Sequence, residues 1–376
     1  MSELGRIPFN RACFQGKELE YIAEAIANGH ISGDGSFTKK CQQMLEQMLG
    51  VPKALLTTSC THALEMAAML LDIAPGDEVI VPSFTFVTTV SAFVLRGAVP
   101  IFVDIRPDTL NVDEAQLEAR ITARTKAIVV VHYAGVACEM DPILEIANRH
   151  GVRVIEDNAH GLTGKYRGHF LGTLGCLATQ SFHETKNVTC GEGGALLIND
   201  PSLVERAEII REKGTNRSRF FRGQVDKYTW VDLGSSYVPS DMLAAFLYAQ
   251  LADIETIQRN RHRVWSFYAD RLKDWAAAHG AALPAVPEWC EQSYHMFYLL
   301  LPTLAEREEL IRKLRAQGVY AVFHYVPLHL SDMGRRFGGK EGDCPVTESV
   351  SDRLVRLPFY NELSEEAQRR IIAAMS

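Results

Sequence analysis

The stretch SFHETKN at residues 181–187, followed by GEGG at residues 191–194, decides the fold of this chain. An apolar run at residues 152–155 lies upstream and ends in the acidic pair Glu156 and Asp157. A lysine and an acid at neighbouring strand ends are what pyridoxal phosphate (PLP) chemistry requires. The amine bonds covalently to the cofactor aldehyde, and the carboxylate keeps the pyridine nitrogen protonated. A solvated surface position is the ordinary alternative for a single lysine, but these combined signals favour a chemical role for Lys186.

The composition is that of a globular enzyme. The chain has 376 residues, of which 47% are hydrophobic and 23% charged, so it can bury the core of two domains or of one large α/β unit. The net charge of -7, with no strongly basic block, argues against nucleic acid or an anionic membrane as a partner. No apolar segment reaches the ~20 residues that a membrane-spanning helix needs.

The cysteines predict a reducing compartment. Eight are scattered along the chain without a C-x-x-C pair, a spacing typical of free thiols and not of a disulfide framework or a zinc site. We therefore expect no bound metal. The N-terminus, with Glu3 and Arg6 and no apolar run, does not resemble a secretion signal, so we expect a cytoplasmic protein.

Short apolar runs alternate with helical patterns between residues 54 and 200. The expected strands are residues 54–58, 78–82, 99–104, 127–132, 152–156, 178–182 and 195–198, and the expected helices are residues 63–71, 88–96 and 142–150. This alternation predicts an α/β fold whose mostly parallel sheet is covered on both faces. Ligands then bind at the carboxyl ends of the strands.

The C-terminal part has a different pattern. A long helix is expected from Asp241 past Arg263, and strands at residues 294–301 and 319–324 flank a helix at residues 304–317. We therefore predict a large PLP-binding domain at residues 1–250 and a smaller α+β domain at residues 251–376.

A phosphate site is predicted where a strand passes through a polar turn into a helix at residues 55–65. The first N–H groups of a helix have no intrahelical partners and carry partial positive charge, so they suit a phosphate. The amides of Thr61 and His62, helped by the Ser181 hydroxyl, are the candidates. The alternative is that Ser59 or Thr61 only caps the helix.

Three further side chains are candidates for the cofactor ring. Asp157 ends a strand, where it could hold the pyridinium proton, although acids are common in turns after parallel strands. His160 follows three residues later and could contact the ring or could be structural. Phe86 could stack on the ring from another strand end, whereas Phe84 suits core packing.

Candidate substrate contacts come from two segments. His324, Tyr325 and His329 follow a predicted strand of the small domain and suit a substrate wall, although both histidines could be structural. Arg217 belongs to a stretch of arginines and aromatic residues at 211–228 that could hold a nucleotide diphosphate by charge and stacking. A solvated loop is the alternative for each arginine.

Together these motifs occur in a characteristic order. They are SCT at 59–61, PSFTF at 82–86, EDNAH at 156–160, SFHETKN at 181–187, GEGG at 191–194 and HYVPLH at 324–329. The order resembles the DegT/DnrJ/EryC1/StrS family of sugar aminotransferases, from residue 7 to the C-terminus. The resemblance implies the aspartate aminotransferase fold (fold type I of PLP enzymes). It also implies that Lys186 is the covalent lysine, that Asp157 is the pyridinium partner and that Phe86 is the stacking aromatic. A dehydratase branch of the family carries histidine in place of the lysine, so Lys186 indicates amino transfer.

Stretches outside the cofactor motifs, at residues 131–141, 211–218 and 220–230, resemble a subgroup of this family that acts on dTDP-4-keto sugars. The resemblance thus implies L-glutamate as amino donor, dTDP-4-dehydro-6-deoxyglucose as acceptor, and a homodimer with shared active sites. Many relatives carry an asparagine where this chain has Ser236, and that asparagine reaches the cofactor phosphate of the neighbouring subunit. The alternatives are an enzyme for another nucleotide keto sugar (3-keto or gluco epimer) and a cofactor-binding regulator without turnover.

Overall fold

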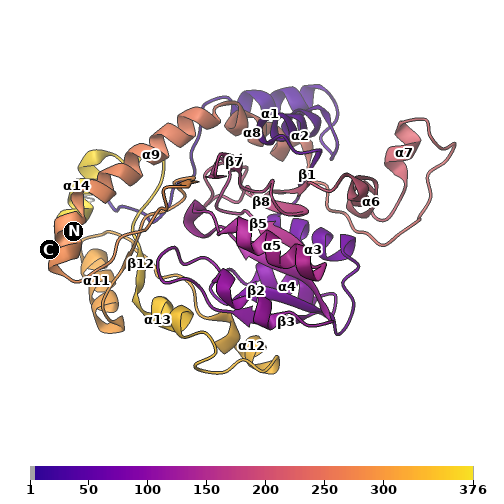
Figure 1. Ribbon diagram of the computed structural model, residues 1–376. Coiled ribbons are helices and arrows are strands. Elements are labelled where there is room, and N and C mark those ends of the chain that lie inside the picture. Colours follow the sequence, from indigo (N-terminus) through magenta and orange to yellow (C-terminus); the bar gives the residue numbers. More distant parts are fainter. Residues whose placement is uncertain (1–4, 376) are drawn as a thin grey trace.

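A seven-stranded sheet forms the centre of the computed structural model, which describes residues 5–375 (Figure 1). Its strands are β1 (Lys53–Thr57), β2 (Glu78–Pro82), β3 (Val99–Val103), β4 (Thr125–Val131), β5 (Arg153–Asp157), β8 (Leu177–Ser181) and β9 (Gly194–Ile198), in the order β1-β9-β8-β5-β4-β2-β3. The pairs from β3 to β8 are parallel, and β9 is antiparallel to both of its neighbours. The predicted α/β class and the mostly parallel sheet are confirmed.

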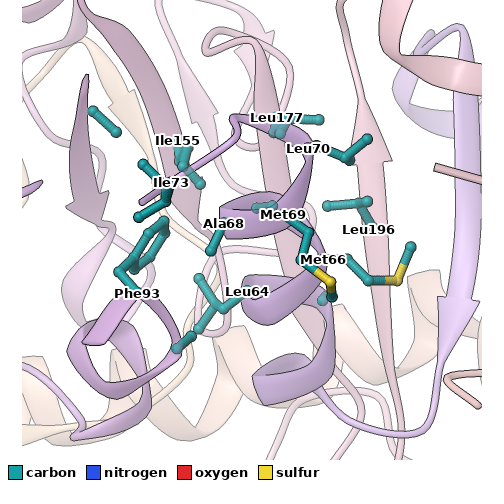
Figure 2. Close-up of a cluster of buried hydrophobic side chains, with 14 of the residues drawn as sticks. Leu64, Met66, Ala68, Met69, Leu70, Ile73, Phe93, Ile155, Leu177 and Leu196 are labelled. Atoms are coloured by element: carbon teal, nitrogen blue, oxygen red, sulfur yellow. The ribbon is translucent and has the colours of Figure 1, made fainter. Parts of the chain in front are cut away.

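One face of the sheet is covered by α3 (Cys60–Leu70), α4 (Thr88–Val94) and α6 (Val204–Arg211). The apolar side of α3 is packed against strand residues such as Leu177 and Leu196 (Figure 2). Buried residues alternate between the two faces along each strand, so this packing fixes which strand residues face the opposite side.

The opposite face is covered by α5 (Met140–His150) over β4 and β5, and by α1 (Glu18–Ala27), α2 (Ser36–Leu49) and α8 (Asp241–Ala252) over β1, β9 and β8. Both faces are thus apolar, which is why the strands read as continuous hydrophobic runs. The helices α1 and α2 were not predicted. The first turn of α2 is held by Asp241, whose carboxylate accepts hydrogen bonds from the Thr38 amide (2.8 Å) and hydroxyl (2.8 Å).

The remaining elements are short or lie in the C-terminal part. They are α7 (Arg217–Phe221), α9 (Ile254–Arg271), α10 (Lys273–Ala278), α11 (Leu304–Ala316), α12 (Asp332–Arg336), α13 (Pro345–Arg353), α14 (Glu365–Ala373), the paired strands β11 (Tyr298–Leu300) and β12 (Leu354–Arg356), and the small sheet of β6 (Lys165–Tyr166), β7 (His169–Phe170) and β10 (Cys290–Glu291). Ile7, near the N-terminus, packs into the C-terminal core beside Val319. The domain boundary at residue 250 stays a prediction.

Two sequence predictions for the C-terminal part are corrected. The long helix from Asp241 is two helices, because the backbone leaves the helical region at Asp253 (φ -116°, ψ 25°). Residues 319–324 form no strand, since Val319 bridges to Ile7 whereas Val322 bridges to Arg356. A segment that changes partner after three residues cannot build a ladder.

Within residues 5–375 all eight cysteines are unpaired. The same residues contain no helix that could span a bilayer and no cluster of three or more side chains suited to binding a metal.

Candidate active site

A cavity of about 420 Å³ lies at the carboxyl ends of β5 and β8. It brings together most of the side chains that the sequence singled out: Thr61, Phe86, Asp157, His160, Ser181, Lys186, His324 and Tyr325. They come from both the sheet and the C-terminal part of the chain. The location agrees with the rule that α/β sheets bind ligands at the carboxyl ends of their strands.

Asp157 ends β5 and is buried. Its Oδ2 accepts a hydrogen bond from the Thr89 hydroxyl (2.7 Å) and its Oδ1 accepts one from the Ala159 amide (3.2 Å). Burial raises the pKa of this carboxyl, while the bonds from Thr89 and Ala159 oppose the rise. Among the described residues no cation lies within ion-pair distance of Asp157, so it can receive a protonated ring nitrogen.

Lys186 lies in the loop between β8 and β9. Removal from solvent lowers its pKa to about 8, and the positive charge of Arg356 adds to this, whereas Cys60 and Asp157 oppose it. The amine can therefore lose its proton at a pH where a solvated lysine stays charged. A deprotonated amine is what covalent chemistry and proton transfer require.

The cavity wall opposite these groups contains histidines that stay neutral. The rings of His160 and His295 are stacked with centroids 4.2 Å apart, and burial lowers the pKa of both well below the usual value. His295 Nδ1 is 2.8 Å from Oδ1 of Asn187, the residue next to the lysine. The Nδ1 of His160 is buried without a hydrogen-bond partner, so a polar ligand atom could satisfy it.

The start of α3 forms the predicted phosphate end of the cavity. Ser59, Cys60 and Thr61 line it, and Ser181 approaches from β8. A Cβ on Gly194 would lie 2.4 Å from the Cys60 nitrogen and 2.4 Å from the Ser59 carbonyl carbon, so only glycine lets β9 approach this turn.

His62 contributes less to the cavity than the sequence predicted. Its amide donates to Ser59 Oγ (3.1 Å), as in the capping alternative, and its ring contacts the Thr58 hydroxyl and packs against Tyr237 (5.1 Å between centroids). The side chain therefore does not line the cavity, although the capped amide still lies in the first turn of the helix.

Aromatic side chains close one side of the cavity. Phe86 is 56% exposed at its rim, and its ring centroid lies 6.4 Å from that of Tyr325. An exposed ring at this position is available for stacking on a bound heterocycle. Phe84 is buried in the core, as the sequence argument favoured.

Two predicted substrate residues lie away from the cavity. His329 is fully buried between Ser83 Oγ (2.6 Å from Nδ1) and Glu348 Oε1 (2.9 Å from Nε2), so it does not line the cavity. Arg217 is in α7, over the ring of Phe221 (5.1 Å), and does not line the cavity of its own chain. The two histidines of the HYVPLH motif thus lie in different places: His324 lines the cavity, whereas His329 is buried outside it.

Sequence reasoning missed Thr89, His295 and Arg356. Thr89 lies in a predicted helix and His295 in a predicted strand, whereas Arg356 lies in a stretch for which no element was predicted. Their positions depend on how the C-terminal part packs onto the sheet, and no local pattern signals that.

The site has the features that PLP requires. A half-buried lysine and a buried carboxylate line the same cavity, and no described residue lies within ion-pair distance of either, although each could pair with a group of the cofactor. Lys186 would carry it, Asp157 would meet the ring nitrogen, Phe86 would stack on the ring, and the turn at 59–61 with Ser181 would hold the phosphate.

Comparisons with known proteins agree with this geometry. The model of the DegT/DnrJ/EryC1/StrS aminotransferase family matches residues 12–376. A GDP-perosamine synthase from Caulobacter vibrioides is 34% identical over 382 residues, covering 100% of this chain and 99% of the relative. A pleiotropic regulatory protein from Geobacillus stearothermophilus is 34% identical over 340 residues, covering 90% of this chain and 88% of the relative.

A putative sugar aminotransferase from Streptococcus pneumoniae, solved in its PLP form, superimposes with a TM-score of 0.90 at 26% identity, covering 99% of this chain and 98% of that one. The same pneumococcal protein was also solved in its PMP form. With the family match and the Lys186–Asp157 site, these findings identify the cofactor as PLP. The chain belongs to the DegT/DnrJ/EryC1/StrS aminotransferase family and is a PLP-dependent sugar aminotransferase.

Proposed function

We propose that the enzyme moves the amino group of L-glutamate to C4 of dTDP-4-dehydro-6-deoxyglucose, giving dTDP-4-amino-4,6-dideoxygalactose and 2-oxoglutarate. The stretches at residues 131–141 and 211–230 support this choice, since they resemble transaminases that make this amino sugar for enterobacterial common antigen, a cell-envelope polysaccharide. We further propose that the reaction takes place in the cytoplasm, where the eight thiols would stay reduced.

The observation that carries the proposal is the pairing of Lys186 and Asp157 in one cavity. When bound, PLP supplies an aldehyde for the amino group and a ring that accepts electrons. The Lys186 amine moves a proton between the α-carbon of the donor and the cofactor, because its lowered pKa lets it act as a base. Asp157 holds the ring nitrogen protonated, and the neutral histidines bring no competing positive charge. In the second half-reaction the same groups transfer the amine to the sugar.

A second acceptor has independent support. The Caulobacter relative is named for a GDP sugar, so a GDP-linked keto sugar is the rival substrate. Both acceptors present a keto pyranose to the same amine, and they differ in the nucleotide.

We also propose a homodimer with shared active sites. The segment around α7 projects from the body of the molecule (Figure 1). It exposes several large apolar side chains: Phe220, Phe221, Tyr228, Trp230, Val231 and Leu233. Apolar residues gathered on a projecting segment favour burial against another chain. A second copy could bring this segment, with Arg217 and Ser236, to the mouth of the cavity.

The decisive experiment incubates the PLP-loaded enzyme with L-glutamate and a panel of dTDP-, UDP- and GDP-linked keto sugars, followed by NMR of the products. We expect 2-oxoglutarate and a 4-amino galacto sugar from the dTDP substrate. A 3-amino or gluco product, or turnover of the GDP substrate alone, would contradict the proposal. A regulator without turnover would leave the cofactor absorbance unchanged with every donor.

A further inference from the structure

Arg356 ends β12 and reaches the cavity from the C-terminal part of the chain. It is the only arginine among the lining residues of the described chain. Its charge lies close enough to Lys186 to lower the pKa of that amine, and it has the same effect on His160, His295 and His324. The guanidinium therefore faces the centre of the site.

The hydrogen-bonding capacity of Arg356 is largely unused. Its Nε is buried without a partner, and its Nη1 lies 3.3 Å from Nε2 of His324. No carboxylate of residues 5–375 lies within ion-pair distance of it. Its apolar support comes from Phe9, whose ring centroid is 4.6 Å from the guanidinium carbon.

A second arginine shows what a purely structural role looks like in this protein. Arg261 is buried, whereas Arg356 is half-buried, and both pack on an aromatic ring, Arg261 on that of Phe359. It donates from Nε to the Tyr294 carbonyl (2.9 Å), from Nη1 to Asn361 (3.0 Å) and from Nη2 to the His295 carbonyl (2.5 Å). Arg261 thus links separate segments of the chain by hydrogen bonds, whereas Arg356 retains donors that are free to bind a ligand.

The contact between Arg356 and His324 determines which nitrogen of His324 carries the proton. An arginine can only donate, so the Nε2 of His324 must accept and its proton must be on Nδ1. That Nδ1 then donates to the hydroxyl of Tyr133 (3.0 Å). The histidine is therefore neutral, and it leaves the charge of Arg356 uncompensated.

We propose that Arg356 binds the α-carboxylate of the amino donor. A planar guanidinium with free donors matches a carboxylate in shape and charge, and such charge-assisted bonds are among the strongest in proteins. The inference rests on the proposed function, because it assigns a place to one of that reaction's two substrates.

The depth of Arg356 favours the donor carboxylate over the diphosphate of the acceptor. The α-carboxylate is attached to the carbon that carries the reacting amine, so it must lie beside Lys186. The diphosphate is separated from the keto carbon by the pyranose ring and therefore lies farther out. In the other half-reaction Arg356 meets sugar hydroxyls, which accept hydrogen bonds without neutralising its charge.

The test compares the two half-reactions in Arg356→Gln, Arg356→Lys and the wild-type holoenzyme, followed by cofactor absorbance. For Arg356→Gln we expect the half-saturating concentration of L-glutamate to rise about 10- to 100-fold, the usual effect of losing hydrogen bonds to a charged group. Arg356→Lys should recover part of the loss. In the keto-sugar half-reaction, which starts from the aminated enzyme, the half-saturating concentration of the sugar should change less than about threefold, because no charged hydrogen bond is lost there.

Two further measurements isolate the carboxylate. Binding of 2-methylglutamate, which has no α-hydrogen to lose, reports affinity without turnover and should weaken in parallel with glutamate. The wild type should prefer glutamate to 4-aminobutyrate, which lacks the α-carboxylate, and Arg356→Gln should lose that preference. Arg353→Gln is the matched control, since Arg353 donates to the Ser349 carbonyl within α13 and does not line the cavity.

The outcomes separate this inference from the proposed function. Unchanged glutamate binding in Arg356→Gln, or an equal loss in the sugar half-reaction, would overturn the carboxylate role, and the latter would assign Arg356 to the acceptor. A wild-type enzyme that responds only to another α-amino acid would correct the donor, and loss of that response in Arg356→Gln would still support the subsite. A wild type that responds to no amino acid would overturn both proposals.

Discussion

Lys186 shows at the level of one residue how catalysis and stability oppose each other. The cavity that lowers its pKa to about 8 does so by removing the amine from water, which costs folding free energy. The same burial makes the amine reactive. In the proposed reaction, the lysine therefore gains reactivity at a cost in stability.

Replacement of the lysine tests its chemical role. We expect Lys186→Ala to lower transamination by at least about 10⁴-fold, the upper range for removing a positioned acid–base group, and to remove the absorbance of the lysine-bound cofactor. Lys165→Ala is the control, because Lys165 pairs with Glu291 outside the cavity. Turnover near the wild-type level in Lys186→Ala would reassign the lysine.

The stability effect of Lys186 has a defined pH dependence in the cofactor-free protein. The folded-state pKa of about 8 lies below the value of 10.5 for a solvated lysine, so the unfolded chain binds more protons between these values. The penalty is complete below about pH 8 and disappears as the pH rises toward 10.5. This shift corresponds to about 3 kcal/mol, which solvent screening of the half-buried side chain reduces. We therefore expect Lys186→Met to be more stable than wild type by about 2 kcal/mol at pH 7, with the difference shrinking above pH 8. Urea unfolding of both proteins across this range measures it, and a difference that grows with pH would contradict the assignment.

Asp157 should matter for rate more than for cofactor retention. An amide in Asp157→Asn cannot hold a proton on the ring nitrogen, so we expect proton abstraction to slow by about 100-fold or more. Thr89→Val removes one hydrogen bond to the carboxylate and should have a smaller effect in the same direction. Single-turnover measurements with glutamate compare the two, and an unchanged rate in Asp157→Asn would exclude the pyridinium role.

At the scale of elements, the site depends on the close contact between β9 and the start of α3. Gly194 pairs with both Thr57 and Ser181, which places the strand against the phosphate turn. The distance between Gly194 and the turn leaves no room for a side chain, so the geometry of the turn depends on how closely β9 packs against it.

Gly194→Ala should therefore disturb both the phosphate turn and the packing of β9. The added methyl would push the turn away, and we expect a loss of about 1–3 kcal/mol in unfolding free energy together with weaker PLP binding. Gly5→Ala is the control, because the atom nearest to its Cβ would be 4.0 Å away. Thermal unfolding and PLP titration report the two effects, and normal values for both would show that the contact relaxes easily.

At the scale of the whole molecule, the projecting α7 segment exposes large apolar side chains, which supports the proposed dimer. Trp230 and Phe221 are 76% and 70% exposed, although both are large and apolar. We expect the wild type to sediment as a dimer and the double variant Phe221→Asp/Trp230→Asp to dissociate at least about tenfold more readily, as expected when a buried aromatic anchor is lost. Analytical ultracentrifugation measures this, with the exposed Leu19→Asp in α1 as control. An unchanged dimer would place the interface elsewhere.

The sequence by itself predicted the sheet and several of the side chains that the structure brings together in one cavity. Apolar strands between amphipathic helices leave few topologies, and Asp157 and Ser181 follow from their places at the ends of β5 and β8. Lys186 follows from its short distance along the chain from Ser181. These residues were predictable because strand ends near in sequence or neighbouring in a parallel sheet meet at one edge.

Only the tertiary structure decided the opposite wall of the cavity. His295 and Arg356 belong to irregular or short elements. They reach the cavity of Lys186 only because segments far apart in the chain pack together. His329 shares a motif with His324 but points into the core. Local patterns encode which face of an element is buried, whereas the direction of a loop side chain depends on the packing of distant segments, and this is why the substrate wall could not be read from the chain.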